Sequence, residues 1–189
     1  MEAATKRPLP PPEFHLSVTA DRGSIKDIVK GRLPLHLHPT ATSNRSTTGL
    51  NTNSLPALLH TIFFHRSFTP LLPSTHEILD LTLPYLPSQS TLIDTKVASL
   101  SDRGGKITVQ FLEKKRKKGW FVTKADEETV WESWVLDCVV GGSGGSGRGQ
   151  LRREALKVVE ICMRERNHIP PITTNEREPF PYNVVVSSR

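Results

Sequence analysis

Apolar and polar residues alternate with a period of two in several stretches of the chain, and this pattern predicts half-buried β-strands. The clearest pair comprises residues 106–112, where Ile107, Val109 and Phe111 alternate with mostly polar neighbours, and residues 130–140. Both arms are rich in the β-branched and aromatic residues that favour strands. We therefore predict that residues 106–140 form a long β-hairpin. Shorter strands are predicted at residues 14–19, 77–83 and 182–186.

Other stretches repeat their apolar residues with the helical spacing of three and four, which predicts amphipathic helices. One comprises residues 88–101, and another comprises residues 150–167, whose apolar positions cover more than half of the helix circumference. We therefore expect residues 150–167 to form the central helix of the core. The glycine repeats at residues 141–149 are typical of a flexible linker, because a phosphate-binding loop would end in Gly-Lys-Ser or Gly-Lys-Thr.

The first helical stripe is interrupted. Apolar residues at positions 25, 28 and 29 continue in register at positions 58, 59, 62 and 63 when residues 32–57 are removed. This register predicts that residues 32–57, which are rich in Pro, Ser, Thr and Asn, are a disordered insertion in one helix or an artefact of the gene model. Two helices joined by a loop are the alternative, although such long linkers are uncommon.

The end of this stripe carries Phe64, one step beyond the buried positions, and then His65. We expect both side chains to be partly exposed. An exposed aromatic residue beside an imidazole at a helix end indicates contact with another protein.

Composition places few restrictions on function. The net charge is +6, and much of the excess lies in the basic run at residues 114–118, so contact with nucleic acid or an anionic membrane is permitted but not required. Cys138 and Cys162 lie in apolar surroundings, which predicts buried thiols in a reducing compartment. The sequence has no signal-peptide pattern and no apolar run of membrane-spanning length. We expect a cytoplasmic protein with a disordered, proline-rich tail at residues 1–12 and one domain at residues 13–189.

No set of residues indicates catalysis, a cofactor or a metal ion. Serine, histidine and acidic residues are scattered, without a nucleophile motif or paired carboxylates. His36 and His38 have no third ligand nearby in the sequence, and no Cys-x-x-Cys pair exists. We expect a protein that is not an enzyme.

The connection inside the long hairpin carries adjacent aromatic residues, Trp120 and Phe121, between the basic run and an acidic turn at residues 126–128. These rings could pack back on their own sheet, since Trp is usually buried. The charged neighbours favour the other interpretation, in which the pair is an exposed binding anchor. Basic and aromatic residues together also occur in modules that bind nucleic acid or anionic membranes. The acidic turn opposes phosphate, so we expect no nucleic-acid binding, while membrane contact stays an alternative.

Four blocks of sequence together resemble a known family. They are residues 58–67 (LLHTIFFHRS), 111–121 (FLEKKRKKGWF), 130–134 (VWESW) and 158–160 (VVE) with Pro170 downstream. In order and spacing they resemble the autophagy-related protein 101 family, over most of the chain outside residues 1–12 and 32–57.

The resemblance implies an α+β fold: a HORMA domain, in which an antiparallel sheet packs on about three helices and a hairpin loop protrudes. It implies a non-catalytic adaptor that pairs with, and stabilises, the HORMA domain of autophagy-related protein 13 in the protein kinase complex that starts autophagosome formation at the phagophore assembly site. Trp120 and Phe121 match the family's WF finger, which recruits downstream factors. Phe64 and His65 match the helix end used in the dimer contact. Since only three residues follow the last predicted strand, we expect a fixed, open-like shape without a peptide-locking cycle.

Overall fold

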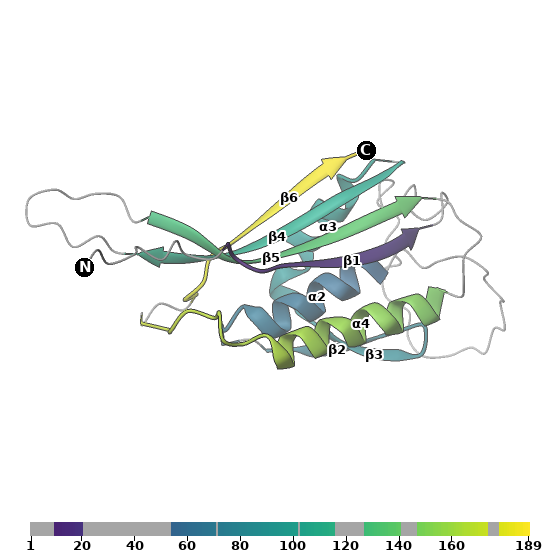
Figure 1. The fold of residues 1–189 in the computed structure, drawn as a ribbon. Helices are drawn as coiled ribbons and strands as arrows, with labels where there is room; N and C mark the ends of the chain where they lie inside the picture. The colour runs from purple at the N-terminus through teal and green to yellow at the C-terminus, as the bar shows by residue number, and fades with distance from the viewer. Residues whose placement is uncertain are drawn as a thin grey trace, which may run out of the picture.

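The computed structural model describes residues 10–20, 54–70, 72–101, 103–115, 127–140, 147–173 and 178–189. Within these residues the fold is α+β, with one four-stranded sheet, a separate two-stranded hairpin and helices packed below the sheet (Figure 1). The elements are β1 (Glu13–Ala20), α2 (Ser54–Arg66), β2 (Ser74–Ile78), β3 (Leu81–Tyr85), α3 (Pro87–Ala98), β4 (Gly104–Lys115), β5 (Glu127–Val140), α4 (Gly147–Arg164) and β6 (Tyr182–Ser188).

The four-stranded sheet has the order β1-β5-β4-β6, and it is mixed. β4 is antiparallel to both β5 and β6, as expected, but β1 is parallel to β5, with Glu13 opposite Ser133 and Ala20 opposite Val140. The expectation of a purely antiparallel sheet is therefore wrong. The period-two pattern of a strand specifies which side chains face the core, and it does not specify the direction of the neighbouring strand.

Residues 77–83 do not form the single strand that their alternation predicted. They belong to the β2–β3 hairpin, which turns at Leu79 and Asp80, where φ is 51° and 60°. Two-residue hairpin turns with positive φ at both positions usually contain Gly or Asn, so this turn lacks its usual sequence signal. The hairpin packs on α2, where the rings of His60 and Tyr85 lie 4.6 Å apart.

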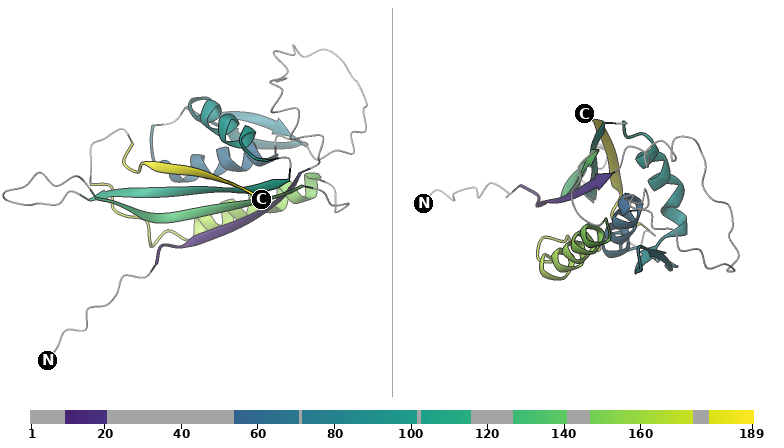
Figure 2. Two further views of the ribbon diagram at one scale, coloured as in Figure 1. Left: turned by 90° about the horizontal axis from the view of Figure 1, so that it is seen from above. Right: turned by 90° about the vertical axis from the view of Figure 1, so that its right-hand side faces the viewer.

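The central helix is α2, and not α4 as predicted. Residues on every side of α2 are buried, including Leu58, Ile62 and Phe63, because the sheet covers one face of this helix and the β2–β3 hairpin covers another (Figures 1 and 2). α4 buries one stripe, Leu151, Ala155, Val158 and Cys162. Its remaining apolar residues are left at the surface.

A β-bulge between Phe111 and Leu112 changes the alternation of β5. Glu132 lies opposite Phe111, and Trp131 is the extra residue, so both of their side chains reach the helix side of the sheet. Trp131 packs on Phe111 and on His168, with ring centroids 5.7 Å and 5.8 Å apart. The bulge thus brings the Trp131 ring to the side of the sheet that Glu132 already faces by its alternation with Trp134.

Polar side chains of α4 satisfy the outer backbone groups of β1, which is an edge strand. Residues 150, 154 and 157 of the helix are spaced to reach alternate residues of the strand. Thr19 N donates to Gln150 Oε1 (3.3 Å), Gln150 Nε2 donates to Ser17 O (3.1 Å), Ser17 N donates to Glu154 Oε2 (3.4 Å) and Lys157 Nζ donates to His15 O (2.7 Å). This edge of the sheet is therefore closed to other strands.

Several helices and segments begin at other residues than the sequence predicted. α2 begins at Ser54, so residues 54–57, the last four of the predicted disordered insertion, form the first turn of a helix. Pro56 is tolerated there because the first N–H groups of a helix have no intrahelical acceptor. α4 begins at Gly147, inside the predicted linker 141–149. The tail at residues 1–9, the rest of the insertion up to residue 53, residues 141–146 of the linker, and Trp120 and Phe121 lie outside the described residues.

Candidate functional site

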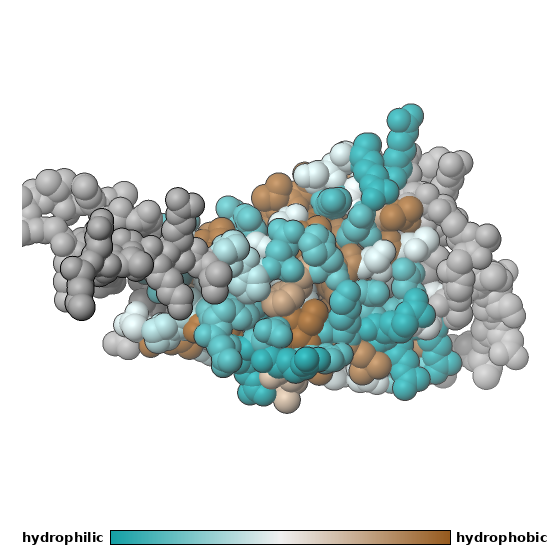
Figure 3. Space-filling model, in the orientation of Figure 1, coloured by the Kyte–Doolittle hydropathy of each residue, from teal (hydrophilic) through white to brown (hydrophobic). Residues whose placement is uncertain are grey.

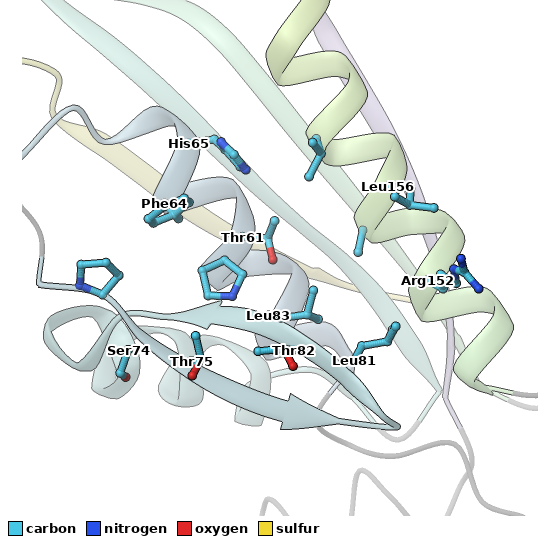
Figure 4. A pocket seen from close by; sticks show the side chains of 14 residues that line it. Thr61, Phe64, His65, Ser74, Thr75, Leu81, Thr82, Leu83, Arg152 and Leu156 are labelled. Atoms are coloured by element: carbon cyan, nitrogen blue, oxygen red, sulfur yellow. The ribbon is translucent and has the colours of Figure 1, made fainter.

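An apolar groove lies between the C-terminal half of α2, the β2–β3 hairpin and α4 (Figure 4). Its volume is about 520 Å³. The side chains of Thr61, Leu83 and Leu156 come from these three elements and line the same space. A concave surface of this size and character is a candidate binding site.

The end of α2 supplies Phe64 and His65. Phe63 is fully buried, whereas Phe64 is 40% exposed, and the rings of Phe64 and His65 contact each other with centroids 5.1 Å apart. Ser67 closes this end of the helix by donating from both its N–H and its hydroxyl to Phe63 O. The structure therefore places both predicted residues at the mouth of the groove. Their role in binding stays a prediction.

α4 supplies a second exposed apolar row. Leu156, Val159 and Met163 are 58%, 38% and 57% exposed, and their spacing of three and four residues places them on one side of the helix. Leu156 and Val159 line the groove, and Met163 continues the row beyond it. Sequence reasoning assigned these residues to the core. The sequence correctly indicated a wide apolar face on α4. That face is wider than the stripe that the core covers, so these three residues face outward.

The rest of the surface gives a contrast. On the face shown in Figure 3, where β1 and α4 lie in front, most residues are hydrophilic and hydrophobic residues form small separate areas. Isolated exposed apolar residues are normal for a soluble protein, whereas a lined groove indicates a binding surface.

A buried ionic cluster fixes the wall of the groove from beneath. Glu132 of β5 is fully buried, and Arg66 of α2 is 2% exposed. Arg66 Nε donates to both carboxylate oxygens of Glu132 at 2.8 and 2.9 Å. The same carboxylate accepts from Trp134 Nε1 and contacts His168 Nε2 at 2.7 Å. We refer to Arg66, Glu132, Trp134 and His168 as the Glu132 cluster.

The guanidinium of Arg66 also joins α2 to the end of α4. Its Nη1 and Nη2 groups donate to Cys162 O (3.3 Å) and Glu165 O (2.9 Å). These carbonyls lie in the last turn of α4 and just after it, where a helix leaves acceptors unpaired. Arg66 follows Phe64 and His65 directly, so the cluster holds the two helices that form the groove in fixed relation.

The groove carries little charge. None of the described residues that line it is acidic, and Arg152 is the fully ionised one. Burial, and then the neighbouring charge of Arg66, lowers the pKa of His65, so its imidazole is neutral at neutral pH. A complementary partner therefore presents apolar side chains, with a carboxylate or carbonyl opposite Arg152.

Among the described residues, no group of three or more His, Cys, Asp or Glu side chains could hold a metal ion. Burial raises the pKa of Cys162 to about 12 and also raises the pKa of Cys138, so both thiols stay protonated and are poor nucleophiles. None of the described helices is long and apolar enough to cross a membrane.

Comparison with known proteins gives two findings. The family model described as Autophagy-related protein 101 matches residues 51–176. A protein of Schizosaccharomyces pombe named Autophagy-related protein 101 is 28% identical over 143 residues, which cover 68% of this chain and 76% of the relative.

Proposed function

Because this chain belongs to the autophagy-related protein 101 family, and so has a role in autophagy, we propose that it is a non-catalytic adaptor that binds the HORMA domain of autophagy-related protein 13. In this proposal it stabilises that domain within the protein kinase complex that initiates autophagy, at the phagophore assembly site in the cytoplasm. The mixed sheet with helices on one face is consistent with a HORMA-like fold.

The observation that supports this function best is the apolar groove at the junction of α2 and α4. Phe64, Leu156 and Val159 are exposed although the Glu132 cluster holds their helices rigidly in place. Preformed apolar residues lose little conformational entropy when a partner covers them, so they provide binding energy efficiently. A folded domain with its own apolar ridge would fill such a groove.

We further propose that Trp120 and Phe121 recruit downstream autophagy factors. The arms that lead to them are β4 and β5, which pair from Gly104 to Lys115 with one bulge after Phe111. Since the bulge and the Glu132 cluster tie β5 to the helices, the hairpin has a firm base from which to present a binding segment. In this proposal one surface holds the partner and a separate segment contacts later factors.

Binding to the HORMA domain of autophagy-related protein 13 tests the first proposal. Leu156→Glu places a carboxylate in the groove, and we expect it to weaken the complex by about thirtyfold or more, which corresponds to at least about 2 kcal/mol at a central interface residue. Isothermal titration calorimetry measures this change. Ile172→Glu is the matched control, because Ile172 is 56% exposed but lies outside the groove.

The outcome is decisive in both directions. Loss of binding in the Leu156 variant, with binding intact in the Ile172 variant, supports the groove as the interface. Equal binding by both variants, or no complex with the wild-type chain, would contradict it. The double variant Trp120→Ala, Phe121→Ala should keep the complex and lose capture of downstream factors.

A further inference from the structure

The two edge strands of the main sheet, β1 and β6, differ in whether side chains bond to their outward backbone groups. α4 covers the backbone of β1 with three polar side chains, whereas no side chain among the described residues bonds to the backbone of β6. β6 is the last strand of the sheet, and Figure 1 shows it along the upper border. Among the residues that the structure describes, none therefore blocks the outward backbone of β6.

The sequence of β6 contains none of the usual protection of an edge strand. Residues 182–188 read YNVVVSS, without a charged residue or a proline, and the pairing of β6 with β4 shows no bulge. Val185 at its centre is 47% exposed. Exposed edge strands of this length normally carry a lysine, a proline or a bulge, because otherwise they add to another strand.

The hydrogen bonds to β4 determine which backbone groups of β6 point outward. Pro181 O accepts from Leu112 N, and Arg189 N donates to Gly104 O, so the odd-numbered residues of this register bond to β4. In an antiparallel pair the alternate residues direct their N–H and C=O groups away from the partner. Those residues are Tyr182, Val184, Val186 and Ser188.

We propose that a second copy of this chain binds here, with β6 pairing antiparallel to β6 of that copy around a two-fold axis at Val185. In this register Val184 bonds to Val186 of the second copy and Tyr182 bonds to Ser188, so every outward backbone group finds a partner. Val185 lies opposite Val185 of the second copy in a non-hydrogen-bonded pair, where side chains are closest. Such β-branched pairs stabilise sheets, and no charges oppose one another.

This surface is separate from the groove. β6 borders the sheet, while the β2–β3 hairpin and the groove lie on the other side of α2 (Figures 1 and 2). The paired chains share one continuous sheet with four strands from each copy, and each chain keeps its groove free. The inference goes beyond the proposed function: if both hold, the assembly presents two grooves and binds two partner domains.

Sedimentation equilibrium on the full chain tests the pairing. A single-strand contact buries less than the roughly 1,200 Å² of a standard interface, so we expect a dissociation constant of about 10–100 µM. The weight-average mass should rise from 21.1 kDa toward twice that value between about 1 µM and about 300 µM protein. Val185→Lys places two ammonium groups at the axis and should weaken association by more than about tenfold. Ile172→Lys, the matched control, should associate like the wild type.

Amide hydrogen exchange on the wild-type chain tests the register without any substitution. The amides of Val184 and Val186 should exchange quickly at low concentration and slowly at high concentration. The amide of Val185, which bonds to β4, should be protected at both. A monomer throughout the concentration range, or a dimer in which Val184 and Val186 exchange quickly, would overturn the proposal. Leu156→Glu should leave self-association unchanged, so failure of the groove and failure of the edge are distinguishable.

Discussion

Replacement of Glu132 by Gln tests the reasoning behind the Glu132 cluster most directly. Gln fills nearly the same space but lacks the negative charge, so the guanidinium of Arg66, which is 2% exposed, loses its counter-ion. Removal of one partner from a buried ion pair costs about 3–5 kcal/mol, because the other charge stays desolvated. Since Gln retains a hydrogen-bond acceptor, we expect a loss of about 3 kcal/mol in the free energy of unfolding.

Urea denaturation measures this loss, and a double-mutant cycle identifies its origin. Arg66→Met alone should cost about 3–5 kcal/mol, and the double variant should cost less than the sum by at least about 2 kcal/mol, because no unpaired charge is left. Glu160→Gln is the control: its pair with Arg164 is exposed, so we expect less than about 0.5 kcal/mol. Additive single effects, or a loss below about 1 kcal/mol for Glu132→Gln, would refute the reasoning.

Other predictions follow from single contacts. Burial lowers the pKa of His60 to about 4, and its Nδ1 accepts from Leu86 N, so the folded state takes up this proton only below the pH at which the unfolded state does. Stability should therefore fall by roughly 2–3 kcal/mol as the pH drops from about 6.5 to about 4, and His60→Asn, which keeps an acceptor, should remove that part of the dependence in urea titrations. Gly105→Ala should lower the melting temperature and raise amide exchange at the end of β6, because the added Cβ would lie 2.4 Å from Ser187 O. Asp80→Gly should stabilise the protein by about 0.5 kcal/mol in thermal melts, because Gly adopts the positive φ of this turn more readily.

The sequence predicts those elements best whose pattern has a local cause. The arms of the long hairpin, expected at residues 106–112 and 130–140, form β4 and β5 with ends moved by three residues or fewer. Their β-branched and aromatic residues fit a pleated, half-buried surface, which is the environment of both strands. The parallel pairing of β1 has no such signal, because strand direction is set by the connections and not by alternation.

The site could be predicted only in part. Phe64 was expected at the surface because it falls outside the buried stripe of α2, and it is exposed. Leu156, Val159 and Met163 were assigned to the core, because a wide apolar face looks the same whether it packs on its own protein or is left for a partner. Glu132 alternates in phase with Trp134, on the core side of β5, and a charge in that position needs a buried counter-ion, but its partner Arg66 is distant in sequence.

The polar side chains through which α4 holds β1 have a consequence for how the groove works. α4 forms one wall of that groove with its apolar row, while on another side Gln150, Glu154 and Lys157 are fastened to the strand. If α4 slid or rotated to accommodate a binding partner, these hydrogen bonds would break. The backbone groups of the edge strand β1 would then be left unpaired. We therefore expect α4 to keep its position when the groove is filled, so that the conformational adjustment falls on the binding partner.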